Sequence, residues 1–201
     1  MYIPRHFAVT DPETLRKVIL DNSFATLVTA TSDEPFATHI PLLLEGDQLV
    51  GHMARANPHW KAFDGRQALA IFQGPHAYVS PRVYVTSPNV PTWNYVTVHV
   101  YGKPELIEDP SESADVLYRS MKVYDPSMQL DQAFHEYLQR QLPGIVAFRM
   151  PIERMEGKFK LNQNKKPEDR DAVIAAFSAS RIADELNVAA EMVAHYPDSA
   201  T

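Results

Sequence analysis

Hydrophobic and polar residues alternate most clearly along residues 93–107, which predicts a long β-strand. Tyr95, Thr97, His99 and Tyr101 would lie on one face of it and Val96, Val98 and Val100 on the other. Shorter patterns predict strands over residues 24–30, 36–44, 48–54, 67–73, 76–85, 145–150 and 153–161. Residues 45–47 read as the turn of a hairpin. The pattern indicates a mostly antiparallel sheet.

Helix signals are concentrated in the second half of the chain. Residues 109–112 resemble a capping box, and residues 131–142 and 167–179 have helical patterns. A last helix over residues 181–195 would bury Ile182, Leu186, Ala189 and Val193. Together with a short helix after Asp11, these elements predict a mainly β (α+β) fold, a β-barrel with peripheral helices. We expect a barrel domain over residues 1–178 and a helical extension over residues 179–201.

One segment combines a strand end with features that attract anions. The strand over residues 48–54 leads into Arg55, Asn57 is a good N-cap, and Pro58 suits the first position of a helix. A helix start exposes backbone N–H groups, and an arginine fork suits phosphate. His59 adds a third potential donor. The segment therefore predicts a phosphate site, the alternative being a turn with a solvated arginine.

Composition narrows the class of protein. Of the 201 residues 45% are hydrophobic and 22% charged, and there is no apolar run long enough to cross a membrane. No signal peptide is recognisable at the start, so we expect a cytoplasmic protein. The absence of cysteine excludes disulfides and thiolate metal sites. The net charge of −6 disfavours tight DNA binding by an isolated subunit.

Two further segments are candidates for ligand contacts. Trp93, Asn94 and Tyr95 could cover a planar ring and contact its polar edge, or they could fill the core. Gln163 and Asn164 lie in an amide-rich turn that could contact a ligand or cap the next helix. Glycine-rich phosphate loops and the common hydrolase motifs are missing, and the histidines show no metal-binding spacing. We expect no metal site.

These segments, in this order, resemble the PaiB family, described as FMN-binding negative transcriptional regulators related to pyridoxamine-phosphate-oxidase-like split barrels. The resemblance covers about residues 1–177 and rests on residues 1–7, 51–60, 73–81, 91–95, 99–102 and 160–169. It implies a split-barrel homodimer that binds FMN. The residues implied in cofactor binding are Arg55, Asn57 and His59 at the phosphate, Trp93, Asn94 and Tyr95 near the ring, and Gln163 and Asn164 completing the pocket. The sequence departs from the family pattern at Val83, where an aromatic is expected, and at Asn162, where serine is typical.

Three functions are compatible with this resemblance. The first is a transcriptional regulator that acts on DNA indirectly, because the chain is acidic. The second is a flavin-dependent oxidoreductase, in which FMN would carry the electrons. The third is a haem-binding or haem-degrading protein, with an iron ligand among His39, His52, His76 and His99. The visible spectrum of the purified protein would distinguish the two cofactors.

Overall fold

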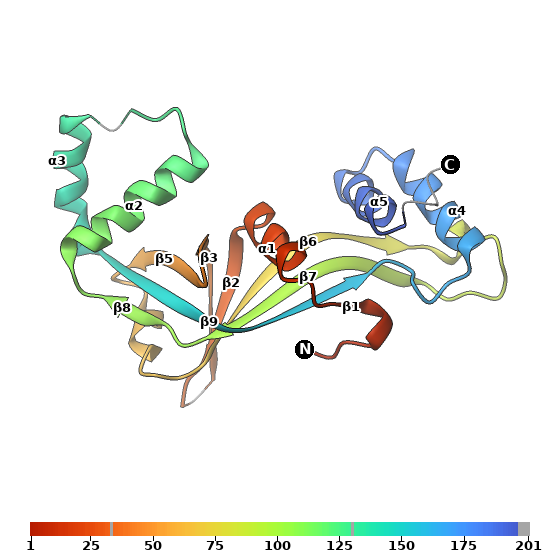
Figure 1. The fold of residues 1–201 in the computed structure, drawn as a ribbon, viewed down its shortest axis with the longest axis horizontal. Coiled ribbons are helices and arrows are strands. Elements are labelled where there is room, and N and C mark those ends of the chain that lie inside the picture. Colours follow the sequence, from red (N-terminus) through yellow and green to blue (C-terminus); the bar gives the residue numbers. More distant parts are fainter. Residues whose placement is uncertain (33, 130, 197–201) are drawn as a thin grey trace. The chain divides into compact units, whose positions relative to one another are not determined.

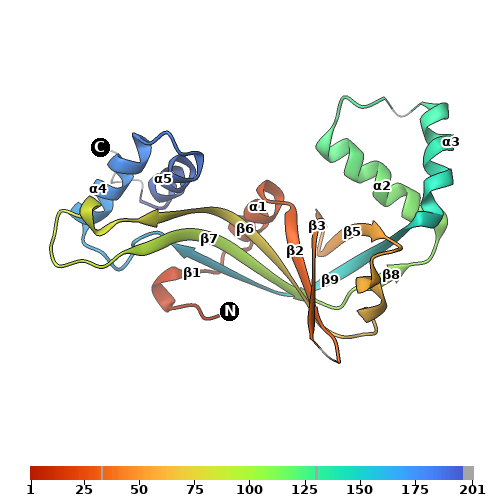
Figure 2. The same cartoon turned by 180° about the vertical axis from the view of Figure 1, so that it is seen from behind.

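The structure, a computed structural model, describes residues 1–32, 34–129 and 131–196. Within these residues the strands form one sheet in the order β3-β2-β6-β7-β9-β5-β4, with β1 and β8 also paired to β9 (Figures 1 and 2). The strands are β1 (Ala8–Val9), β2 (Phe24–Ala30), β3 (Pro35–Pro41), β4 (Leu43–Glu45), β5 (Gln48–Ala54), β6 (Ala68–Val79), β7 (Thr92–Gly102), β8 (Glu105–Ile107) and β9 (Ile145–Lys160). The curled antiparallel sheet with helices around it confirms the predicted α+β split barrel.

Five α-helices and four short 3₁₀-helices accompany the strands in the described part of the chain. They are α1 (Pro12–Asp21), α2 (Pro110–Tyr124), α3 (Gln132–Gln141), α4 (Pro167–Ser178), α5 (Ala183–His195), η1 (Arg5–Phe7), η2 (Pro58–Ala62), η3 (Pro81–Val83) and η4 (Leu142–Gly144). The starts of η2, α2 and α3 have side-chain N-caps at Asn57, Asp109 and Asp131, and the sequence predicts the first two of these caps. The Asp109 carboxylate, for example, accepts hydrogen bonds from the backbone N–H groups of Ser111 and Glu112 at the start of α2. No helix among the described residues is both long and apolar enough to span a membrane.

The chain divides into two compact units, and β6, β7 and β9 contribute residues to both. Unit 1 comprises residues 1–18, 73–98 and 156–201, and unit 2 comprises residues 19–72 and 99–155. In unit 1, β1 pairs with the end of β9, and α4 packs against α5. In unit 2, β2 pairs with β3 and β6, while β5 pairs with β4 and β9.

Two strands continue through positions where the sequence predicts a break. β6 contains Gly74, where an added Cβ would lie 3.1 Å from Val96 Cβ, so this glycine permits close strand packing instead of ending the strand. β9 contains Pro151, which is the last residue of its pairing with β5. At that position the missing N–H interrupts no further pairing with β5. The strands predicted over residues 145–150 and 153–161 are therefore the single strand β9. Those predicted over residues 67–73 and 76–85 are joined in β6, which ends at Val79, so the predicted strand is wrong over η3 (Pro81–Val83).

The alternation predicted for residues 93–107 is confirmed in β7, where Val96, Val98 and Val100 are buried. The strand is shorter than predicted and is followed by β8 as a separate element. The predicted buried face of the last helix is wrong in part. Ile182 and Leu186 are 57% and 40% exposed. The buried residues of α5 are Val188, Ala189 and Met192, because α4 and the sheet of unit 1 pack against the side of the helix that carries them.

Candidate functional site

Arg55 follows β5 in unit 2 and is held by the segment that leads into β9. Its Nε donates to the Pro143 carbonyl oxygen at 2.9 Å and its Nη2 donates to the Ile145 carbonyl oxygen at 2.8 Å. Its own carbonyl oxygen accepts a hydrogen bond from Trp60 Nε1 at 3.0 Å. Two of the five guanidinium N–H groups are therefore used for positioning, and three remain for an anion.

Asn57 is the N-cap that the sequence predicts, but the helix after it is the five-residue 3₁₀-helix η2. Its Oδ1 accepts from the His59 backbone N–H at 3.0 Å, and its Nδ2 donates to Thr38 Oγ1 at 3.2 Å. Both ends of this amide are thus satisfied within the protein. So short a helix has little dipole, so phosphate affinity here would depend on side chains rather than on the helix start.

His59 is buried, with 1% exposure, between the rings of Phe36 and Phe63. Its Nδ1 lies 2.8 Å from Thr38 Oγ1, while its Nε2 is buried without a partner among the described residues. Burial lowers the pKa of His59, which favours the neutral ring at physiological pH. If the Thr38 hydroxyl donates to Nδ1, Nε2 carries the proton and His59 can offer one neutral hydrogen bond to a ligand. His59 is among the residues that line a pocket of about 330 Å³ in unit 2, but its Nε2 is itself buried.

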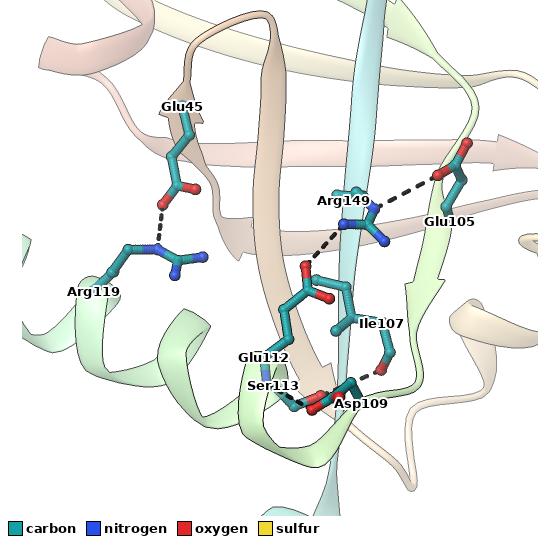
Figure 3. A network of polar contacts seen from close by, with 8 residues as sticks. All are labelled: Glu45, Glu105, Ile107, Asp109, Glu112, Ser113, Arg119 and Arg149. Atoms are coloured by element: carbon teal, nitrogen blue, oxygen red, sulfur yellow. Dashed lines mark hydrogen bonds and ion pairs between the residues drawn. The ribbon is translucent and has the colours of Figure 1, made fainter.

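A second pocket in unit 2, of about 490 Å³, includes Arg55 and Trp60 in its lining. The N-terminal turn of α2 forms part of its wall, and Figure 3 shows the polar contacts that hold this helix. Arg149 on β9 pairs with Glu112 at 2.8 Å and with Glu105 at 3.6 Å. These contacts hold α2 to the strands of unit 2, so the part of the pocket wall that α2 forms is fixed in position.

The candidate ring face lies in unit 1. Trp93 is 53% exposed, and its ring lies 6.2 Å from the ring of His76 and 5.9 Å from the ring of Tyr78. Gln73 Nε2 lies 3.2 Å from His76 Nδ1. A pocket of about 370 Å³ is lined by Gln73, His76, Trp93, Tyr95, Val96 and Thr97. Exposed aromatic rings and an amide around such a pocket suit a planar heteroaromatic ligand.

Asn94 lies on the opposite face of β7 from Trp93 and Tyr95. It is fully buried, and its Nδ2 contacts Met192 Sδ of α5 at 3.5 Å. Its Oδ1 has no partner among the described residues. The structure therefore groups Trp93 with Tyr95 and places Asn94 beneath α5, as the two-residue period of a strand requires.

Hydrogen bonds from a side-chain amide to the backbone stabilise the turn after β9. Gln163 Oε1 accepts from the Leu161 backbone N–H at 2.7 Å, and its Nε2 donates to the Phe159 carbonyl oxygen at 2.6 Å. Asn162 has a φ of 65° and donates to the Tyr84 hydroxyl at 3.4 Å. Asparagine adopts this left-handed conformation more readily than serine, which gives the departure at position 162 a backbone reason. Asn164 in the same turn is exposed.

The four histidines considered as haem ligands are dispersed. His76 is at the ring face of unit 1, whereas His39, His52 and His99 are in unit 2. Burial is the main cause that lowers the pKa of both His52 and His99. Across the residues that the structure describes, no three His, Asp or Glu side chains are grouped as metal ligands.

The sequence indicated residues 158–165 as a segment that could bind a ligand or cap a helix, but Lys158 and Lys160, at the end of β9, were not among the predicted site residues. The signal available was their spacing of two residues around buried Phe159 on a strand. Whether such lysines have acidic partners depends on the tertiary structure, so the sequence alone could not identify them as unusual.

Comparison with known proteins identifies relatives over most of the chain. Residues 1–154 match the family described as "Putative FMN-binding domain". "Protease synthase and sporulation protein PAI 2" of Bacillus subtilis is 38% identical over 183 residues, which cover 87% of this chain and 87% of that protein. An uncharacterized protein of Emericella nidulans is 27% identical and covers 88% and 90% of the two chains.

Solved structures share the fold at low sequence identity. The flavocytochrome Anf3 from Azotobacter vinelandii aligns with a TM-score of 0.64 at 19% identity, covering 79% of this chain and 72% of that one. The FAD and heme binding protein from Mycobacterium smegmatis aligns with a TM-score of 0.62 at 18% identity, covering 76% and 73%. At these identities the similarity establishes the fold alone.

Proposed function

Because this chain belongs to the putative FMN-binding domain family, we propose that it binds FMN and acts as a homodimeric regulator of transcription. The observation that carries the proposal is the ring face of unit 1. There Trp93 is half exposed beside His76 and Tyr78, next to a pocket of about 370 Å³. A large aromatic surface left open to water is typical of a ligand site.

The residues divide by the chemistry that they offer. In unit 1, Trp93 and Tyr95 would pack against the ring system, and Gln73 could hydrogen-bond to its edge. In unit 2, Arg55 keeps three N–H groups for an anion, and His59 keeps its buried Nε2. Within the segment of Arg55, Asn57 and His59, the proposal assigns the phosphate to Arg55, because the Asn57 amide is already hydrogen-bonded at both ends and His59 lines a different pocket. FMN, when bound, would supply hydride or electron transfer, and the protein would supply positioning.

Regulation through a partner fits the charge of the chain. With a net charge of −6, an isolated subunit lacks the excess of basic residues that drives binding to the phosphate backbone of DNA. We propose that the protein acts in the cytoplasm as a homodimer, and that its effect on transcription passes through another protein or a flavin-linked signal.

The test is a titration of FMN and riboflavin into wild-type protein and the Arg55→Ala variant, followed by absorbance and calorimetry. Flavin bands in the bound state are expected, and a Soret band after haem addition would favour the haem-binding alternative. Loss of a charge-assisted bond to phosphate should weaken FMN binding by roughly ten- to a hundredfold. Riboflavin lacks the phosphate and should bind both proteins equally. Failure of wild-type protein to bind FMN would overturn the proposal, and equal FMN affinity in both proteins would remove Arg55 from the site.

A further inference from the structure

Two lysines of β9 share a face with the aromatic residues of β7 in unit 1. Lys158 Nζ lies 5.4 Å from the ring centroid of Tyr95, and Lys160 Nζ donates to the Trp93 carbonyl oxygen at 2.6 Å. Lys160 also donates to Thr92 Oγ1. Phe159, between the two lysines, is buried on the other side of the strand. Lys158 therefore borders the ring face through Tyr95, and Lys160 lies at the start of β7 against Thr92 and the Trp93 backbone.

Neither ammonium group has a carboxylate partner within the part of the chain that the structure describes. Lys158 is 9% exposed and donates to the Tyr2 carbonyl oxygen at 3.1 Å. Its Nζ lies 5.6 Å from the Tyr2 ring, and Lys160 Nζ lies 5.9 Å from the Phe7 ring. These aromatic contacts only partly offset the cost of removing two cations from water. In a chain with a net charge of −6, two such cations without acids are a notable exception.

The lysines retain enough donors to bind one anionic group. Each ammonium has three N–H bonds; Lys158 uses one, to Tyr2, and Lys160 uses two, to Thr92 and Trp93. Three N–H bonds remain, which is sufficient for a carboxylate or a phosphate. Burial lowers the pKa of Lys160, and the positive charges of Lys158 and Lys165 lower it further. An anion bound between the lysines would relieve both effects.

We propose that Lys158 and Lys160 form an anion site beside the aromatic pocket, and that its ligand is a planar aromatic molecule carrying a carboxylate or phosphate. The proposal rests on the proposed function in its use of the ring face, and it adds the charge that the ligand must carry. Trp93 and Tyr95 would contact the ring, and the lysines would contact the anionic group. Because the phosphate of FMN is assigned to the segment of Arg55, the ligand proposed for the lysines is a smaller aromatic acid.

The experiment compares a charged and a neutral probe of the same shape, naphthalene-2-carboxylate and naphthalene-2-carboxamide, by calorimetry. The double variant Lys158→Gln/Lys160→Gln should bind the carboxylate at least about tenfold more weakly than wild type and the carboxamide equally well. Lys158→Arg/Lys160→Arg, which keeps both charges, should retain most of the affinity. Lys166→Gln is the matched control, because Lys166 is an exposed lysine that already lies 4.0 Å from Glu168. Melting curves of all variants check that they are folded.

The same variants titrated with FMN separate this proposal from the proposed function. Suppose that the folded double variant binds both FMN and naphthalene-2-carboxylate as tightly as wild type does. This result overturns the anion site and leaves the FMN proposal standing. Lysine-dependent binding of the carboxylate without any FMN binding supports the anion site and overturns the FMN proposal. If wild-type protein binds neither anion, both proposals are wrong.

Discussion

A single carboxylate, Asp169 in the first turn of α4, holds the segment that follows η3 in unit 1. Asp169 is buried, and its Oδ1 accepts from the backbone N–H groups of Val85 and Thr86, each at 2.9 Å. Its Oδ2 accepts from the Thr86 hydroxyl at 2.6 Å. These hydrogen bonds lower the pKa of Asp169, and the bond from the Thr86 hydroxyl has the largest effect.

The lowered pKa predicts an acid-sensitive contribution to stability. A carboxylate whose pKa is lower in the folded state stabilises the fold above its unfolded pKa, and this contribution is lost as the pH falls toward the folded pKa. Asp169→Asn should therefore lower the melting temperature at pH 7 and reduce its fall between about pH 5 and pH 3. Asp171→Asn is the control, because Asp171 is exposed on the same helix. Parallel pH dependence in Asp169→Asn and wild type would show that this carboxylate does not anchor the segment.

At the scale of elements, β7 and β9 approach closely where Gly102 ends β7. A Cβ added to Gly102 would lie 2.1 Å from the Pro151 carbonyl oxygen and 2.9 Å from Met150 Cγ. Because the first of these atoms belongs to the backbone, the two strands would have to move apart to accept a side chain.

Gly102→Ala should reduce the free energy of unfolding by roughly 1–3 kcal/mol, the usual range for overpacking. Urea unfolding followed by circular dichroism measures this change. Gly144→Ala is the matched control, because a Cβ there meets nothing within 4 Å, and its effect should stay within about 0.5 kcal/mol. A Gly102→Ala protein as stable as this control would contradict the close approach of β7 and β9.

At the scale of the whole molecule, the negative net charge limits the affinity of the protein for DNA. With a net charge of −6 per chain, the purified protein should bind DNA only weakly at physiological salt. Light scattering should show the proposed dimer, and fluorescence anisotropy with labelled duplexes should give micromolar or weaker affinity, on the order of non-specific binding. Nanomolar, sequence-specific binding by the protein alone would overturn the proposed indirect route.

Much of the fold followed from local sequence signals. The alternation of β7, the N-caps Asn57 and Asp109, and the turn at Gly46 are all present in the structure. These signals can be recognised in the sequence because each depends on a few neighbouring residues. Side chains alternate along a strand, a cap satisfies nearby N–H groups, and the φ of 57° at Gly46 suits glycine. The class of fold was predicted from the order of these signals along the chain, and the family from the resemblance of particular sequence segments.

The tertiary structure decided those features that depend on residues far apart in the sequence. It joined the predicted pieces of β9 across Pro151, and it selected Val188 and Met192 rather than Leu186 as the buried stripe of α5. It also left Lys158 and Lys160 beside aromatic rings, with no acidic partner among the residues that the structure describes, and no local sequence pattern shows this. The physical reason is the same in each case: burial and charge pairing depend on which surface another part of the chain covers, and local sequence signals do not specify that surface.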